Sequence, residues 1–192
     1  MALLMINKIY LNQETISRVK KELQKKKFIL LDEFFDENFY SSIEKEISKN
    51  KFLKKEILDR YSFFELENKK LEKFFLTLQF VEFLEEILGA NLKNINFSAR
   101  KFRHGNYTLL HDSEKNNGGT EFIFFLTNSW NEKFGGNVFY HRKKEPLIVN
   151  PKRNRLFIFN GKNKKFVKYV NNLSGEKNFV LIEGKLNAPT RN

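Results

Sequence analysis

Residues 120–141 read TEFIFFLTNSWNEKFGGNVFYH, and this stretch decides the fold. Its two apolar runs, 120–127 and 137–141, are short and rich in Phe, and Gly135 and Gly136 lie between them, which is typical of neighbouring β-strands. Outward from this stretch, short apolar segments divided by Gly, Asn or Pro fill the second half of the chain. They predict eight strands, at residues 96–103, 107–111, 120–127, 137–141, 146–149, 155–159, 165–170 and 179–186. Strands at this spacing favour a sandwich or a jelly roll.

The first half of the chain predicts helices that cover such a sheet. Apolar residues at helical spacing, with polar caps or Gly at the ends, predict helices at residues 13–26, 36–48 and 71–88. The run FILLDEFF at 28–35 indicates a buried strand, and the apolar N-terminal stretch 1–11 indicates another. Residues 52–68 show no clear period. The predicted fold is therefore α+β, mainly β, a jelly roll with N-terminal supporting helices.

Length and composition set further limits. A chain of 192 residues with 41% hydrophobic content is long enough for one good core, which predicts a single domain over 1–192. Within this domain, residues 1–95 would supply the supporting helices and the entry strands, and residues 96–186 would form the jelly-roll core. The absence of Cys excludes disulfides and thiolate metal sites and fits a reducing compartment, so we expect a cytoplasmic protein. No apolar run approaches the roughly 20 residues of a membrane span.

The positive charge is concentrated in the second half. Residues 96–192 contain 18 Lys and Arg against 7 Asp and Glu, whereas residues 1–95 contain 17 against 16. A basic field of this kind attracts anions, which include nucleic acid, an acidic protein or a dicarboxylate. Solubilising surface lysines are the alternative explanation of the same excess.

Three histidines limit any imidazole-based site to His104, His111 and His141. His111 stands at the end of a predicted strand, beside Asp112 and before a polar loop that ends at Gly119. An imidazole and a carboxylate at one rim are two parts of the facial site that holds iron(II) with three protein ligands. His111 and Asp112 are therefore the candidate metal ligands.

The order of motifs resembles the prolyl 4-hydroxylase-like branch of the Fe(II)/2-oxoglutarate oxygenases, whose fold is a double-stranded β-helix. The resemblance rests on ARKFRHGNYTLLHD (99–112), EFIFFLTNSW (121–130), GGNVFYH (135–141), NPKRNRLFIFN (150–160), KFVKYV (165–170), GEKNFVLIEG (175–184) and, nearer the N-terminus, KFILLDEFFDENFYSSIEKEI (27–47). It implies Fe(II) and 2-oxoglutarate as cofactors and a protein prolyl residue or a small molecule as substrate.

The resemblance also shows where the iron site departs from the family. The family's first motif is His-x-Asp, whereas the carboxylate here is Asp112, directly after the histidine. The second histidine is expected near the start of KFVKYV, where Lys165 and Phe166 stand. Asn172, two residues past that strand, is the candidate ligand, and His141 is an alternative if a neighbouring strand brings it near.

The 2-oxoglutarate anchor has two candidates. Lys177, in Gly-Glu-Lys, resembles the lysine that holds the distal carboxylate, and Tyr107 is a second candidate for that contact.

Three functions stay open at this point. The first is a 2-oxoglutarate-dependent dioxygenase with an incomplete iron site. The second is a non-catalytic jelly roll of the same ancestry that binds an anionic partner. The third is a basic nucleic-acid-binding module, for which the sequence offers aromatic residues among basic ones but no fingerprint. Oligomeric state is not predicted by any pattern in the sequence.

Overall fold

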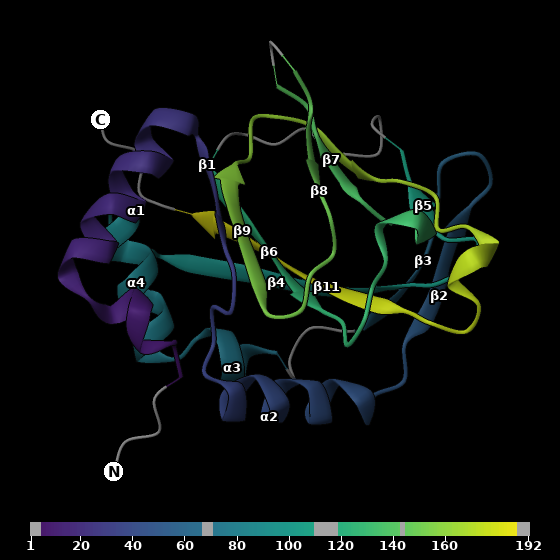
Figure 1. Ribbon diagram of the computed structural model, residues 1–192, viewed down its shortest axis with the longest axis horizontal. Helices are drawn as coiled ribbons and strands as arrows, with labels where there is room; N and C mark the ends of the chain where they lie inside the picture. The colour runs from purple at the N-terminus through teal and green to yellow at the C-terminus, as the bar shows by residue number, and fades with distance from the viewer. Residues whose placement is uncertain (1–4, 67–70, 110–118, 143–144, 188–192) are drawn as a thin grey trace.

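The computed structural model describes residues 5–66, 71–109, 119–142 and 145–187. A large antiparallel sheet forms its centre, with helices packed along one side and end and a small sheet facing the other side (Figure 1). The α-helices are α1 (Gln13–Lys26), α2 (Glu37–Ser48), α3 (Glu72–Phe75) and α4 (Leu78–Leu88), and the 3-10 helices are η1 (Lys8–Leu11), η4 (Glu132–Phe134) and η5 (Asn172–Ser174). None of the described helices is long and apolar enough to cross a membrane.

The strands form two layers. The large sheet has the order β1 (Phe28–Leu31), β9 (Arg155–Asn160), β6 (Thr120–Leu126), β11 (Phe179–Asn187), β4 (Asn94–Phe102), β3 (Tyr61–Leu66) and β2 (Leu53–Ile57), with β5 (Tyr107–Thr108) paired to β3. The small sheet has the order β10 (Lys165–Val167), β7 (Val138–Tyr140) and β8 (Leu147–Val149). β5 also borders β10, because Val167 N donates to Thr108 Oγ1 at 2.8 Å. From β6 onward the chain thus passes repeatedly between the layers, as in a jelly roll.

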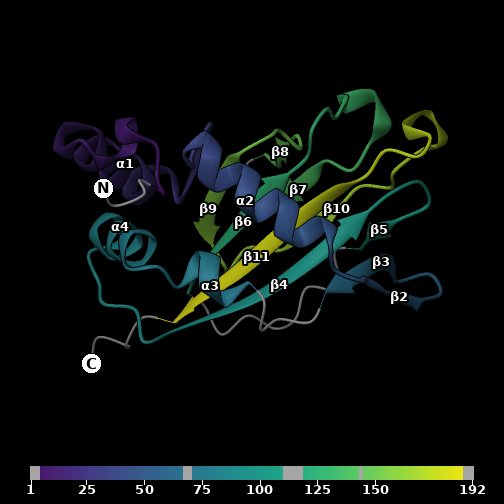
Figure 2. The ribbon, with the colours of Figure 1, turned by 90° about the horizontal axis from the view of Figure 1, so that it is seen from below.

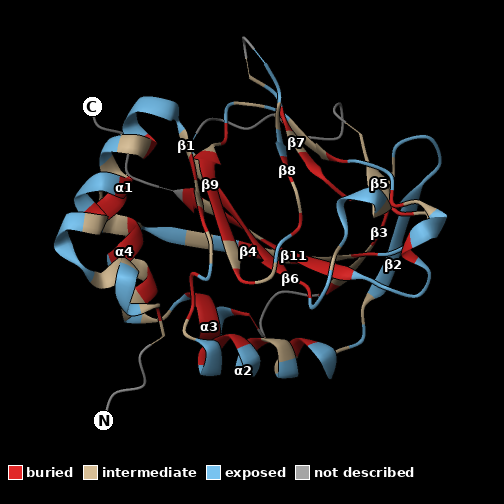
Figure 3. Cartoon of the chain, viewed as in Figure 1, coloured by how far each residue is buried: buried red, intermediate tan, exposed pale blue. Residues whose placement is uncertain are grey.

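Side-chain alternation along β11 separates two cores. Val180 and Ile182 belong to the cluster between the large sheet and the helices, whereas Phe179 and Leu181 belong to the cluster between the two sheets. Neighbouring residues of a strand point to opposite faces, so one strand contributes to both cores. Figure 3 shows the buried residues concentrated in these central strands and on the inward faces of the helices.

The helices begin where the sequence predicts. The Asn12 side chain accepts from Glu14 N at 2.9 Å, and the Asp36 side chain accepts from Asn38 N at 3.0 Å. Each cap satisfies a backbone donor that the first helical turn leaves unpaired. The predicted helices 13–26 and 36–48 are confirmed.

Three expectations in the first half need correction. The predicted strand over 1–11 is wrong in its described part, because Lys8–Leu11 is a 3-10 helix and only Ile6 forms a single bridge, to Phe35. The helix predicted over 71–88 is two helices, since Thr77 takes an extended conformation (ψ 143°) and starts α4 anew. Residues 52–68 contain the hairpin of β2 and β3. Every residue of β2 is exposed, which explains why no apolar period marks it.

Candidate functional site

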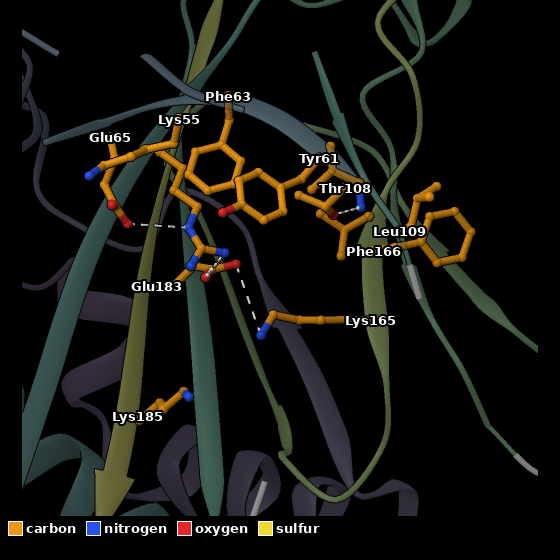
Figure 4. A pocket seen from close by; sticks show the side chains of 13 residues that line it. Lys55, Tyr61, Phe63, Glu65, Thr108, Leu109, Lys165, Phe166, Glu183 and Lys185 are labelled. Atoms are coloured by element: carbon orange, nitrogen blue, oxygen red, sulfur yellow. Dashed lines mark hydrogen bonds and ion pairs between the residues drawn. The ribbon is translucent and has the colours of Figure 1, made fainter. Parts of the chain in front are cut away.

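A cavity of about 360 Å³ opens between the small sheet and the β2–β3 side of the large sheet (Figure 4). Its charged lining consists of four basic and two acidic residues, Lys55, Arg100, Lys165, Lys185, Glu65 and Glu183. Tyr61 and Phe63 form an aromatic wall, with ring centroids 5.1 Å apart in a stacked arrangement. The cavity therefore combines a basic lining with aromatic surface.

Strand register explains why these charges meet. Glu65 of β3 lies directly opposite Arg100 of β4, and Glu183 and Lys185 are alternate residues of β11, so they share the face that looks toward the small sheet. Opposite charges placed across neighbouring strands stabilise the pairing. Lys165 comes from β10 in the other layer, so its ammonium joins the two sheets.

The charges form one network. Lys165 Nζ lies 2.7 Å from Glu121 Oε2 and 4.0 Å from Glu183 Oε1. Arg100 Nη1 lies 3.1 Å from Glu183 Oε2, and its Nε lies 3.7 Å from Glu65 Oε1. The Lys165 side chain is 17% exposed, that of Glu183 14% and that of Glu121 7%. A buried charge is tolerated only when it is paired, and here Glu183 is shared by two cations.

The network fixes the charge states of its members. Burial alone would raise the pKa of Glu183, but the charges of Lys165, Arg100 and Lys185 outweigh it and hold that pKa below its ordinary value. Burial would likewise lower the pKa of Lys165, but the carboxylates of Glu183 and Glu121 raise it. Glu183 is therefore a carboxylate and Lys165 an ammonium at neutral pH.

Of the predicted site residues, those that the structure describes do not line this cavity. His111 and Asp112 lie outside the described residues. Asn172 is exposed in η5, and the exposed Lys177 places its ammonium 5.3 Å from the centroid of the Phe134 ring.

Tyr107 is half-buried in β5, with its ring 6.2 Å from that of Tyr169. It does not line the cavity, and neither does Asn172 or Lys177.

The described residues do not fit an iron(II) ion in the cavity. Among them, His, Asp and Glu nowhere form a group of three that can hold a metal. Lys165 stands at the start of β10, where the second histidine is expected, and an ammonium has no lone pair to offer a metal. It already neutralises the nearest carboxylates, Glu121 and Glu183.

Sequence reasoning missed this network. The available signal was a charged residue at an inward position of an otherwise apolar strand, such as Glu121 before FIFFL or Glu183 after FVLI.

Comparison with known proteins identifies the family. The sequence model described as "Oxoglutarate and iron-dependent oxygenase degradation C-term" matches residues 54–189. The chain belongs to this family. Within the same superfamily, mouse prolyl 3-hydroxylase OGFOD1 is 33% identical to it over 84 residues. That match covers 41% of this chain and only 15% of the mouse protein.

Several solved oxygenase structures have the same fold as this chain. The prolyl hydroxylase of Trichoplax adhaerens, in complex with a peptide fragment of the hypoxia inducible factor oxygen degradation domain, gives a TM-score of 0.71 at 11% identity, over 93% of this chain and 91% of that chain. A prolyl-4-hydroxylase of Pseudomonas putida gives 0.67 at 10% identity, over 90% and 98%. The predicted jelly roll is confirmed, and so is the predicted membership of this chain in the prolyl hydroxylase-like branch of the oxygenases. These relatives are iron(II)- and 2-oxoglutarate-dependent oxygenases.

Proposed function

We propose that this chain acts in 2-oxoglutarate- and iron-dependent hydroxylation as a binding domain of oxygenase fold, whose cavity between the sheets holds an acidic segment of a protein substrate. The observation that carries the proposal is the buried contact of Lys165 with Glu121, 2.7 Å long, at the strand position where the fold's relatives are expected to place a metal ligand. The Lys165 ammonium neutralises the interior carboxylate of Glu121, so that carboxylate does not need a metal ion as its countercharge. The cavity is therefore suited to binding a ligand and not to coordinating a metal.

The lining favours an anionic protein segment. Four basic residues face two acidic ones around the cavity, so a ligand carboxylate enters a field of net positive charge. The stacked rings of Tyr61 and Phe63 offer apolar contact area to an adjacent side chain of the segment. The relatives support a protein substrate, since one is named a prolyl 3-hydroxylase and another was solved with a protein fragment. Free of Cys, the chain suits the cytoplasm, where we propose that it acts.

The family's description favours a second candidate, a complete dioxygenase. In it His111, Asp112 and Asn172 would hold Fe(II), and Lys177 and Tyr107 would hold 2-oxoglutarate. This candidate requires Asn172 and Lys177 to leave their exposed positions and reach a common pocket.

Anaerobic Fe(II) binding separates the two candidates. Wild type, His111→Ala and a prolyl 4-hydroxylase as positive control are titrated with Fe(II), with and without 2-oxoglutarate, and the metal-to-ligand charge-transfer band is recorded. The binding-domain proposal expects the band in the positive control alone. About one iron per wild-type chain, with a band that His111→Ala abolishes, would overturn it in favour of the dioxygenase.

Binding in the cavity has its own test. Fluorescein-labelled hexaglutamate is titrated against wild type, Lys185→Met and the matched control Lys168→Met, an exposed lysine outside the cavity. We expect Lys185→Met to weaken binding about tenfold at fixed ionic strength, since one charge-assisted contact contributes roughly 1.5 kcal/mol. Equal losses in both variants would indicate general attraction to a basic surface and would reject the cavity as the site.

A further inference from the structure

The large sheet ends in a strand that has a neighbour on one side only. β2 (Leu53–Ile57) stands last in the strand order and pairs, among the described strands, with β3 alone. Figure 2 shows the hairpin of β2 and β3 at the end of the sheet that lies away from α1 and α4. The outer edge of such a strand presents backbone N–H and C=O groups that can pair with a further strand.

This edge has few of the features that keep natural sheet edges apart. Such edges are commonly protected by proline, by a bulge or by charged side chains, lysine above all. β2 contains no proline, and its ladder with β3 runs from Leu53 to Ile57 without a bulge. Of its two lysines, Lys54 is already neutralised, since its Nζ lies 2.7 Å from Glu56 Oε2. Lys55 is therefore the only uncompensated charge in the strand.

Apolar side chains stand at both ends of β2. Leu53 is 47% exposed and Ile57 is 43% exposed. Both lie on the same face as Lys55, because side chains alternate along a strand, and Lys55 lines the cavity between the sheets. Covering these two side chains would add apolar burial to the backbone pairing of a further strand.

The sequence of β2, LKKEI, is complementary to itself in the antiparallel direction. A two-fold axis through Lys55 places Leu53 opposite the partner's Ile57, and Lys54 opposite the partner's Glu56. An axis perpendicular to the sheet leaves each face of both copies on the same side, so the contact is symmetric and closed. Residues directly opposite on one face interact, so the pairing gains two apolar contacts and two contacts between opposite charges.

The four charges on the face away from the cavity alternate around this axis. Lys54 and Glu56 are neighbours along one strand, and they follow in the reverse order along the partner strand. Each ammonium then has one carboxylate beside it and another directly across, while like charges take the longer diagonal. On the cavity face the two copies of Lys55 lie opposite each other, which weakens the association.

We propose that β2 pairs with β2 of a second copy of this chain, which joins the two large sheets into one continuous antiparallel sheet. The proposal goes beyond the proposed function, because the pairing requires no ligand in the cavity. The contact is limited to one strand from each copy, so we expect a weak dimer with a Kd of about 10–100 µM. Because Lys55 stands at the axis and lines the cavity, the dimer brings two cavities next to one another.

Sedimentation equilibrium of the whole chain at low ionic strength, from about 5 to about 500 µM, tests the contact. Wild type is compared with Lys54→Glu, Glu56→Lys and the double variant Lys54→Glu/Glu56→Lys, and the two single variants are also mixed in equal amounts. The control Lys168→Glu makes the same change of net charge as Lys54→Glu, at an exposed lysine outside β2. Thermal unfolding checks that every variant is folded.

We expect wild type to form a dimer that dissociates on dilution. Each single substitution at position 54 or 56 should weaken the dimer about tenfold or more, because two attractive contacts across the axis become repulsive. The double variant has opposite charges at both positions again, so it should dimerise like wild type, and so should the control. The mixture should form a heterodimer more tightly than either of its components pairs with itself, since one component carries only acids at positions 54 and 56 and the other only lysines.

The proposal is overturned if wild type stays monomeric at the highest concentration. A wild-type dimer that the single substitutions leave unchanged would use another surface and would reject β2 as the contact. Failure of the mixed variants to associate would also reject the antiparallel register centred on Lys55.

Discussion

Replacing Lys165 by Met tests whether the ion pair between the sheets is a buried structural element. The substitution removes the ammonium that lies 2.7 Å from Glu121 and 4.0 Å from Glu183, and leaves both carboxylates in the interior. Removing one partner of a buried pair costs about 3–5 kcal/mol. Because the Lys165 side chain retains 17% exposure and Met fills most of its volume, we expect the lower end, about 3 kcal/mol. For a chain of 192 residues this corresponds to a fall in Tm of roughly 6–12 °C.

Urea unfolding at pH 7 measures the change, and the double variant Lys165→Met/Glu121→Met supplies the control. The double variant should lose at least about 2 kcal/mol less free energy of unfolding than the two single variants lose in sum, because residues in contact couple strongly. A change below about 0.5 kcal/mol in Lys165→Met would place the pair among solvent-screened surface bridges. That result would refute our explanation of why a lysine occupies this position.

Two further predictions concern the same fold. Asn154→Ala should lower the free energy of unfolding by about 2–3 kcal/mol, because the buried Asn154 amide donates to Phe35 O at 2.8 Å and accepts from Phe35 N at 2.9 Å. Urea unfolding measures this loss, and a clearly smaller value would contradict the prediction. Glu183→Gln should make the free energy of unfolding depend less steeply on pH in the acid range. The pKa of the Glu183 carboxyl is lowered in the folded chain, so this group stabilises the fold above its unfolded pKa of about 4.3 and loses that contribution as the pH falls through its folded pKa. Unchanged steepness between pH 5 and 3 would contradict the shift.

Most strands, and the helices α1 and α2, were predictable from sequence because their signals are local. In residues 120–141, short apolar runs and a Gly-Gly turn lie within a few positions of one another, and Asn12 caps α1 through backbone groups only two and three residues away. The break at Thr77 was not predictable, since the apolar period runs through it without interruption. The aromatic residues on either side of the break, Phe75 and Phe80, pack with ring centroids 5.6 Å apart, a contact that exists only in the folded chain.

The site was less predictable because its contacts are distant in sequence. Lys165 and Glu121 are separated by 44 positions and belong to different sheets, so no local pattern links them. The resemblance to oxygenases indicated where a histidine is expected and that Lys165 stands there. It did not indicate that the lysine is already paired, because that pairing exists only in the folded chain.

The two functional candidates make opposite electrostatic demands on one interior. The carboxylates of Glu121 and Glu183 need positive countercharge, which Lys165 and Arg100 provide from two sheets at distances of 2.7–4.0 Å. An iron(II) ion in the same cavity would bring two further positive charges next to these cations, and at low effective dielectric each like-charge contact raises the free energy of the bound metal. Glu121 and Glu183 are therefore not free to serve as metal ligands while this ion pair is in place. The jelly-roll fold does not by itself decide between the two candidates, because one fold can carry either function.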